Sequence, residues 1–261
     1  MSQTPPPRPL ANRTPFPTQR RHTLLFLDQI RDFSPVHIDT EVDATALVAA
    51  RERARAAGHR RSVVAHVVHA AAGVLAKHPE ANSGIQGRLD PTVAEYGTVS
   101  AKVALDRIWD GRRVVLATVV PDLETAALDD IQAHLDRVAA EDPDTSADFA
   151  PLRALRALPA QEALEAFRAG AERLELRPAV TGTFSVTSLG HRSVDGFYST
   201  GGTTVTLGVG RIADRPVARD GAVVVAPVLR LSLTFDHRVI DGAEAADVLT
   251  EIKEALEGIP G

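Results

Sequence analysis

The chain has 261 residues, enough to bury a sizeable core in a single domain, and it has no cysteine, which excludes disulfides, thiolate–metal sites and a cysteine-linked acyl intermediate. Its formal net charge of −5 leaves no basic footprint, so nucleic acid is not an expected partner. No apolar run approaches the roughly 18 residues that span a bilayer, and the N-terminus lacks the apolar core of a signal peptide, so we expect a cytoplasmic protein without membrane contact.

Two regions of different composition divide the chain. Residues 1–19 are polar and proline-rich, which predicts a disordered or extended arm, whereas residues 20–261 are periodic and predict one domain. In chain order the patterns first predict a strand over 35–42 and helices over 43–57 and 62–77, capped by Asp43 and Ser62. Strands over 98–105 and 113–120 follow, joined by a turn at Asp110-Gly111. The rest of the chain predicts a helix from 121 through 135, a loop over 141–151, a helix over 160–174, strands over 182–187, 203–209 and 223–235, and a final helix to about 256. This order favours an α/β (α+β) fold with helices packed against a large mixed β-sheet.

The segment before the final helix carries the most specific pattern, Phe-Asp-His-Arg-Val-Ile-Asp-Gly over residues 235–242. It places His237 at the end of a predicted strand, and a rigid mount suits a general base, which must lie within about 3 Å of its proton. Asp241 stands where the helix would begin, with Glu244 at the spacing of a capping box, and Gly242 predicts a tight turn.

The longer string Leu-Ser-Leu-Thr-Phe-Asp-His-Arg-Val-Ile-Asp-Gly-Ala over 231–243 resembles the active-site motif of the catalytic domain of dihydrolipoamide acyltransferases, the E2 components of 2-oxoacid dehydrogenase complexes. Further landmarks resemble this family in the same order, at 41–43, 78–82, 115–121 and 183–190, so the resemblance covers nearly the whole chain from Arg20. It implies the two-layer sandwich of chloramphenicol acetyltransferase, and it implies that the strand at 115–121 lines the pantetheine side of a substrate channel.

The resemblance implies acyl transfer from a thioester, which passes through a tetrahedral oxyanion and needs a base and an oxyanion donor. We expect His237 to be the base, the alternative being a structural histidine at a strand end. Thr187 stands where the family carries an oxyanion-binding serine, and it keeps the hydroxyl while adding a stiffer χ1. Ser185 and Ser188 flank it and could take the role if the register differs.

Other residues are expected to support this site. Asp241 could cap the final helix or pair with an arginine, and the resemblance indicates Arg20 or Arg21 as that partner. Asp236, Arg238 and Gly242 belong to the motif without an assigned chemical role, and no cofactor-binding residue is assigned.

Two clusters have ordinary structural interpretations. His66 and His69 lie three apart on an apolar helix with no third ligand nearby, so they are interpreted as core histidines and no metal is expected. The arginines between 51 and 61 are interpreted as a solvated helix end.

The domain begins about 20 residues from the N-terminus, so we expect no lipoyl group on this chain and expect CoA or acyl-CoA as substrate, or a lipoyl or acyl-carrier domain supplied in trans. The family implies a homotrimer with the site between subunits, and residues 256–261 carry too little apolar surface for a hook between trimers. The alternatives are a condensation-type biosynthetic enzyme of the same fold, against which Asp236 in the place of a first histidine counts, and a non-catalytic trimeric scaffold.

Overall fold

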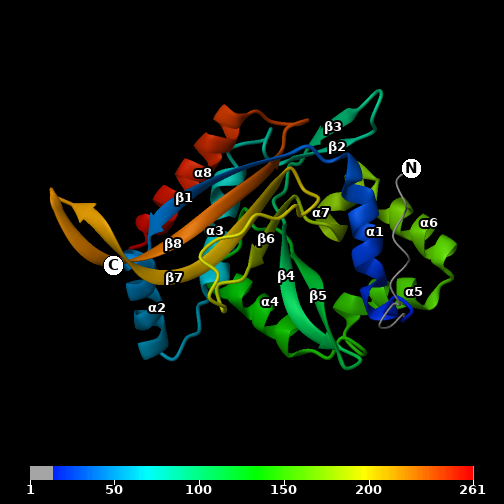
Figure 1. Ribbon diagram of the computed structural model, residues 1–261, viewed down its shortest axis with the longest axis horizontal. Helices are drawn as coiled ribbons and strands as arrows, with labels where there is room; N and C mark the ends of the chain where they lie inside the picture. The colour runs from blue at the N-terminus through cyan, green and yellow to red at the C-terminus, as the bar shows by residue number, and fades with distance from the viewer. Residues whose placement is uncertain (1–13, 261) are drawn as a thin grey trace, which may run out of the picture.

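Six strands form one mixed β-sheet in the order β1-β8-β7-β6-β4-β5, shown in Figure 1. The computed structural model describes residues 14–260. The strands of this sheet are β1 (Pro35–Asp43), β4 (Ala101–Trp109), β5 (Arg112–Val120), β6 (Phe184–Ser188), β7 (Val205–Arg219) and β8 (Ala222–Asp236). β6 runs parallel to both β4 and β7, and the other neighbours are antiparallel, so the expected mixed sheet is confirmed.

The helices pack against this sheet, and a small hairpin of β2 (Ser83–Gln86) and β3 (Thr92–Glu95) forms a separate sheet. The helices are α1 (Arg21–Gln29), α2 (Thr45–Ala56), α3 (Val63–Leu75), α4 (Leu128–Ala140), α5 (Ala150–Ala157), α6 (Ala160–Ala171), α7 (Arg177–Val180) and α8 (Gly242–Glu257), with short 3-10 turns at Thr18–Arg20, Ile30–Asp32, Ala147–Phe149 and Leu174–Leu176. Figure 1 shows α8 and α3 beside the β1–β8 side of the sheet, and α1, α5 and α6 grouped beyond β5. No helix among residues 14–260 is long and apolar enough to cross a membrane.

The two faces of the central strands differ in chemistry because side chains alternate along a strand. On β8, Leu231, Leu233 and Phe235 are fully buried in the core that α3 and α8 complete. Ser232 and Thr234 point to the opposite face, which is therefore polar although it is also buried. We call this second side the hydroxyl face; it also carries Ser185 and Thr187 of β6, Thr206 of β7 and His37 of β1.

Several local predictions are confirmed. The turn between β4 and β5 places Asp110 and Gly111 at positive φ (52° and 72°), as a two-residue hairpin turn requires. Ser62 caps α3 by accepting a hydrogen bond from the backbone N–H of Ala65.

Other local predictions need correction. α2 begins at Thr45 after Ala44, and Asp43 instead accepts from the backbone N–H of Thr45 at 3.0 Å. The expected loop over 141–151 contains a 3-10 turn and the start of α5, because Ser146 accepts from the N–H of Asp148 and initiates it. β7 continues ten residues past the expected end at 209, beyond a register irregularity between Val209 and Ile212.

The expected N-terminal arm over 1–19 falls mostly outside the described residues. Within it, residues 14–17 have no regular secondary structure and Thr18–Arg20 form a 3-10 turn. Sequence patterns did not predict α1 or the β2–β3 hairpin; α1 has nine residues, and each strand of the hairpin has four.

Candidate active site

His237 follows the last residue of β8, so the sheet holds its backbone in place. Its N–H donates to the carbonyl of Ser34 at 2.9 Å, and its ring packs edge-on against Phe235 with centroids 5.4 Å apart. The imidazole Nδ1 lies 3.3 Å from a carboxylate oxygen of Asp241, and 46% of the side chain is exposed. This contact directs Nδ1 toward the carboxylate and leaves Nε2 without a hydrogen-bond partner among residues 14–260.

Asp241 occupies the N-cap position of α8 with an extended backbone (φ −95°, ψ 171°), but its side chain makes no capping hydrogen bond. Glu244 does not complete a capping box either, because it is paired with Nδ1 of His78 at 2.7 Å. The capping-box prediction is therefore wrong, and within the chain the carboxylate of Asp241 faces His237.

Asp236 and Arg238 brace the turn that carries His237. Asp236 is 2% exposed and accepts from the backbone N–H of Ser34 at 3.3 Å and of Arg238 at 3.2 Å. The guanidinium of Arg238 forms a fork with the same carboxylate, at 2.9 and 2.5 Å, and this hydrogen bonding raises the pKa of Arg238. The pair thus fixes the backbone on both sides of the histidine, a role that the sequence alone did not assign.

Gly242 begins α8 with ordinary helical geometry. A Cβ at this position would meet nothing within 4 Å, and Gly242 is not among the glycines with positive φ. Nothing in the geometry of a single chain therefore requires glycine at position 242, where the sequence predicted a tight turn.

Thr187 lies on the hydroxyl face of β6 and is partly exposed. It pairs with Gly208 of β7, which pairs with Ser232 of β8, five residues before His237. Five residues along a strand span about 17 Å and two strand spacings about 10 Å, so Thr187 and His237 lie roughly 20 Å apart. One chain does not bring these two predicted site residues together.

The arginines near the start of the domain do not reach Asp241 either. Arg21 donates through Nη1 to the carbonyls of Arg156 at 3.0 Å and of Leu158, at the C-terminal end of α5. Arg20 closes the preceding 3-10 turn through its backbone N–H. Within one chain Arg21 therefore stabilises the α1–α5 contact and leaves Asp241 unbraced.

A hydrogen-bonded network on the hydroxyl face surrounds Ser185, which the sequence offered only as a substitute for Thr187. Ser185 accepts from the hydroxyl of Thr203 at 2.9 Å, and Thr206 accepts from the backbone N–H of Gly201 at 2.9 Å. A Cβ on Gly201 would approach the Ser185 hydroxyl to 2.5 Å, so the segment before β7 can lie on the sheet only with glycine there. This engagement leaves Thr187 the freer hydroxyl.

Lys102 is the residue of this face that sequence reasoning missed. It pairs with Ser185 across the sheet, donates to the carbonyl of Gly201, and places its ammonium 4.6 Å from the ring centroid of Phe26. Burial lowers the pKa of Lys102 to about 8. The sequence did contain an indication of it, because this lysine stands within the alternating segment 98–105, whose apolar residues predict a partly buried strand.

A cavity of about 400 Å³ opens beside the bracing pair, lined by Asp236 and Arg238, by the Ile30–Asp32 turn, by Gly202–Thr204 and by Arg177. Most of the acidic and basic side chains that line this cavity form ion pairs with one another, for example Arg168 with Asp28 at 2.7 Å. No group of three or more potential metal ligands occurs among residues 14–260.

Comparison with solved structures first defines the fold class. Chloramphenicol acetyltransferase superposes with a TM-score of 0.53 at 17% identity, covering 90% of this chain and 94% of that one. The cubic core of the pyruvate dehydrogenase multienzyme complex gives 0.72 at 21% identity, and the dihydrolipoamide acetyltransferase of Azotobacter vinelandii gives 0.72 at 22%, each covering 98% of both chains. The fold is the chloramphenicol acetyltransferase-like two-layer arrangement, as expected.

Sequence comparison then indicates the family. Residues 157–260 match the family described as 2-oxoacid dehydrogenases acyltransferase (catalytic domain). The acetyltransferase component of the Bacillus subtilis pyruvate dehydrogenase complex is 29% identical over 224 residues, which are 83% of this chain and 43% of that protein. The corresponding component from Staphylococcus aureus (strain Mu50) is 56% identical over 50 residues, which are 19% of this chain and 12% of that protein. The chain thus spans less than half the length of these relatives. The resemblance to the catalytic domain of dihydrolipoamide acyltransferases is confirmed.

Proposed function

We propose that this chain is an acyltransferase that moves an acyl group directly between a thioester carrier and an acceptor, with His237 as general base. The observation that supports this most is the mounting of His237, with its backbone bonded to Ser34, its Nδ1 facing Asp241 and its flanks fixed by the Asp236–Arg238 fork. A scaffold would gain nothing from positioning an imidazole in this way.

The chemistry balances without a protein nucleophile. Nε2 of His237 takes the proton from the acceptor thiol, hydroxyl or amine as that atom attacks the acyl carbon. The tetrahedral oxyanion forms, the carbon–sulfur bond breaks, and the imidazolium returns its proton to the departing thiolate. The hydroxyl of Thr187 donates to the oxyanion in this proposal.

The site would be shared between subunits of a homotrimer. His237 and Thr187 lie roughly 20 Å apart in one chain, which is too far for one tetrahedral centre, so the two roles need two copies. Two different surfaces then meet, and such head-to-tail contacts close as rings. The solved relatives include a cubic core, which supports assembly about symmetry axes, and the family resemblance favours three-fold symmetry.

The substrates we propose are CoA or acyl-CoA on one side and a thiol acceptor on the other. Curated relatives are named dihydrolipoyllysine-residue acetyltransferase components, which supports a lipoyl group as acceptor, supplied here by a partner domain in trans. Calorimetry should detect binding of CoA to the isolated chain. Binding only to a lipoylated domain would instead favour a carrier that is always protein-bound.

The central test compares His237→Ala with His191→Ala, since His191 is a similarly exposed histidine outside the motif (48% of its side chain). With acetyl-CoA and dihydrolipoamide, His237→Ala should lower turnover by about two to four orders of magnitude, the usual contribution of a general base, and His191→Ala should leave it unchanged. Near-normal turnover in a folded His237→Ala protein would exclude His237 as the general base, whereas no turnover in the folded wild type would favour the scaffold alternative.

A further inference from the structure

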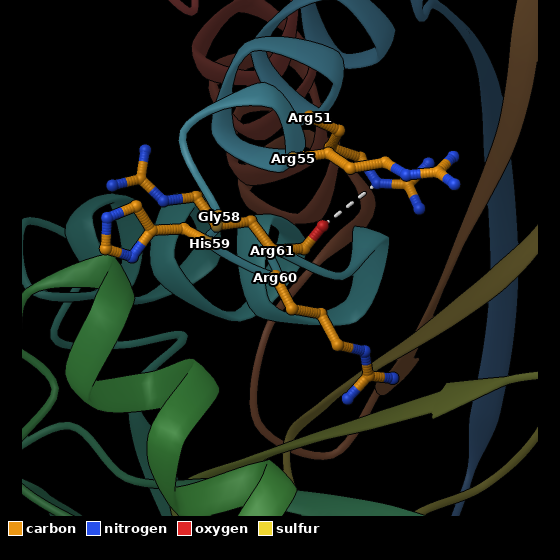
Figure 2. A pocket seen from close by; sticks show the side chains of 6 residues that line it. All are labelled: Arg51, Arg55, Gly58, His59, Arg60 and Arg61. Atoms are coloured by element: carbon orange, nitrogen blue, oxygen red, sulfur yellow. Dashed lines mark hydrogen bonds between the residues drawn. The ribbon is translucent and has the colours of Figure 1, made fainter.

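A hollow lined almost entirely by arginines lies where α2 ends and α3 begins. It encloses about 360 Å³ and is lined by Arg51, Arg55, Gly58, His59, Arg60 and Arg61, without an acidic residue in its lining (Figure 2). We call it the arginine hollow. A chain with a formal net charge of −5 therefore concentrates positive charge at one place.

The charges of the hollow are only partly neutralised. Arg61 is held by Asp129 at 2.7 and 2.9 Å, and Arg60 pairs with Asp136. Among residues 14–260, only these two carboxylates form ion pairs with residues that line the hollow. Arg51 and Arg55 therefore have no anionic partner within the described chain. Arg51 donates through Nε to the carbonyl of Arg61 at 3.0 Å, a bond that orients the side chain without cancelling its charge.

Arg51 and Arg55 lie four residues apart on α2 and so share one face of the helix. Figure 2 shows their side chains running in the same direction, with the bond from Arg51 to Arg61 marked. Like charges at this spacing destabilise an isolated helix. Basic groups near the end of α2 compensate the helix dipole, which accounts for Arg55 but not for Arg60 and Arg61, which follow the helix.

The backbone keeps the hollow open. Gly58 ends α2 at φ +81°, a conformation that favours glycine, and a Cβ there would meet nothing within 4 Å. Arg60 and Arg61 follow this turn and pair with Asp136 and Asp129 of α4, while the carbonyl of Arg61 accepts from Nε of Arg51, so the backbone returns to α2. The positive lining is therefore built by the turn and two ion pairs.

The field of the cluster also reaches the protein interior. His66, one turn into α3, is 5% exposed, and its Nε2 is buried without a hydrogen-bond partner among the described residues. Burial lowers the pKa of His66 to about 4, and the charges of Arg61 and Arg51 contribute in the same direction. Because His66 stays neutral, it adds no positive charge to the cluster and does not increase the repulsion among the arginines.

The hollow is separate from the candidate active site. α3 begins beside the arginine hollow, and at 1.5 Å per residue its far end lies about 20 Å away. Just past that end His78 contacts Glu244, in the first turn of α8 behind Asp241. The length of α3 thus lies between the arginines and the histidine motif.

From this geometry we propose that the arginine hollow binds a phosphate or diphosphate group. Guanidinium groups present paired N–H donors that match phosphate oxygens, and Arg51 and Arg55 supply charge that no carboxylate of the described chain neutralises. The phosphate could belong to CoA itself or to an independent small molecule, and the same donors would serve both. This proposal does not depend on the acyl-transfer function.

The experiment uses the full chain at low ionic strength, where charge pairing is least screened. Inorganic pyrophosphate is titrated by calorimetry into the wild type, into the double variant Arg51→Gln/Arg55→Gln, and into Arg53→Gln as a matched control. Arg53 lies on the same helix, is exposed, and is not in the lining. The double variant should raise the dissociation constant at least tenfold, whereas Arg53→Gln should change it less than twofold, with unchanged thermal unfolding in both.

A second titration with CoA distinguishes the two sources. A parallel loss of CoA affinity in the double variant would assign the phosphate to CoA, and unchanged CoA affinity with lost pyrophosphate affinity would assign it to a separate molecule. The proposal is overturned if pyrophosphate does not bind the wild type saturably, or if the double variant and Arg53→Gln bind it equally.

Discussion

Thr187 is the residue on which the proposed chemistry most needs a direct test, because it keeps the hydroxyl of the family's serine but carries an extra methyl group. The structure distinguishes it from its neighbour: Ser185 is tied to Thr203, whereas no hydrogen bond within residues 14–260 engages the Thr187 side chain. A free hydroxyl on an accessible part of the sheet is available to a substrate oxyanion.

Thr187→Val preserves the shape of the side chain and deletes the hydroxyl. The loss of one oxyanion donor costs about 3 kcal/mol in the transition state, so kcat should fall by two orders of magnitude or more while thioester affinity changes little. Ser185→Ala and Ser188→Ala are the controls. If one of them abolishes turnover while Thr187→Val is silent, the donor lies at a different register.

Lys102 gives a prediction about stability. Its pKa is lowered to about 8 in the folded chain by burial, below the usual value of 10.5, so the unfolded chain holds this proton more tightly. The stability of the wild type should therefore rise with pH between about 8 and 10, as the buried ammonium loses its charge. Thermal unfolding of Lys102→Met across this range should lack that rise; an identical pH profile in the two proteins would contradict the buried charge.

At the scale of helices and strands, the sequence predicted most elements because their periodicity is long. α3 was found from its apolar run and from Ser62, and the β4–β5 hairpin from Asp110-Gly111. α1 and the β2–β3 hairpin were missed because they are short: α1 has nine residues, and each strand of the hairpin has four.

The candidate site was predictable only where its residues are adjacent in sequence. The motif at 235–242 identified His237 and Asp241, but not that Asp236 and Arg238 brace each other, since ion pairing depends on burial that the sequence does not display. The capping-box prediction was wrong for a similar reason, because its glutamate is paired with His78, which lies just past the end of α3.

His78 joins the end of α3 to α8, with its two ring nitrogens 2.7 Å from Glu244 and 3.1 Å from Glu251. Burial opposes the charged form, but hydrogen bonds to both glutamates outweigh it, so the pKa of His78 is raised above 6.5. The stabilisation is complete below pH 6.5 and is lost as pH rises through the raised pKa.

We therefore expect thermal stability to fall above pH 6.5 in the wild type and to fall less in His78→Gln, which cannot gain a proton. Calorimetric unfolding at closely spaced pH values measures the difference. Parallel profiles for the two proteins would show that this contact between α3 and α8 does not depend on charge.

For the whole molecule, the proposed mechanism makes catalysis a property of the assembly, because His237 and Thr187 lie far apart in one chain. Co-expression of His237→Ala with Thr187→Val should restore activity, because an intact histidine of one subunit can meet an intact threonine of its neighbour. Random mixing in a closed ring would restore up to about a quarter of wild-type turnover. Activity no greater than the average of the two variants would place the complete site inside one chain.

Light scattering provides the matching measurement of mass, which should be near that of three chains. Dilution below the dissociation constant should lower specific activity together with the mass. A monomer with full activity would contradict the shared site.

The unused N-cap of α8 has an evolutionary consequence. A cap side chain that bonds the first N–H groups of a helix contributes about 1 kcal/mol, and Asp241 forgoes that bond while its carboxylate faces His237. Selection for heat resistance alone would therefore tolerate or prefer Asp241→Ser, whose hydroxyl can turn back onto the helix. Under the proposed role of Asp241 beside His237, libraries screened by survival at high temperature should accumulate replacements at this position and lose turnover as they do so, because chemistry and folding would then place opposite demands on one residue.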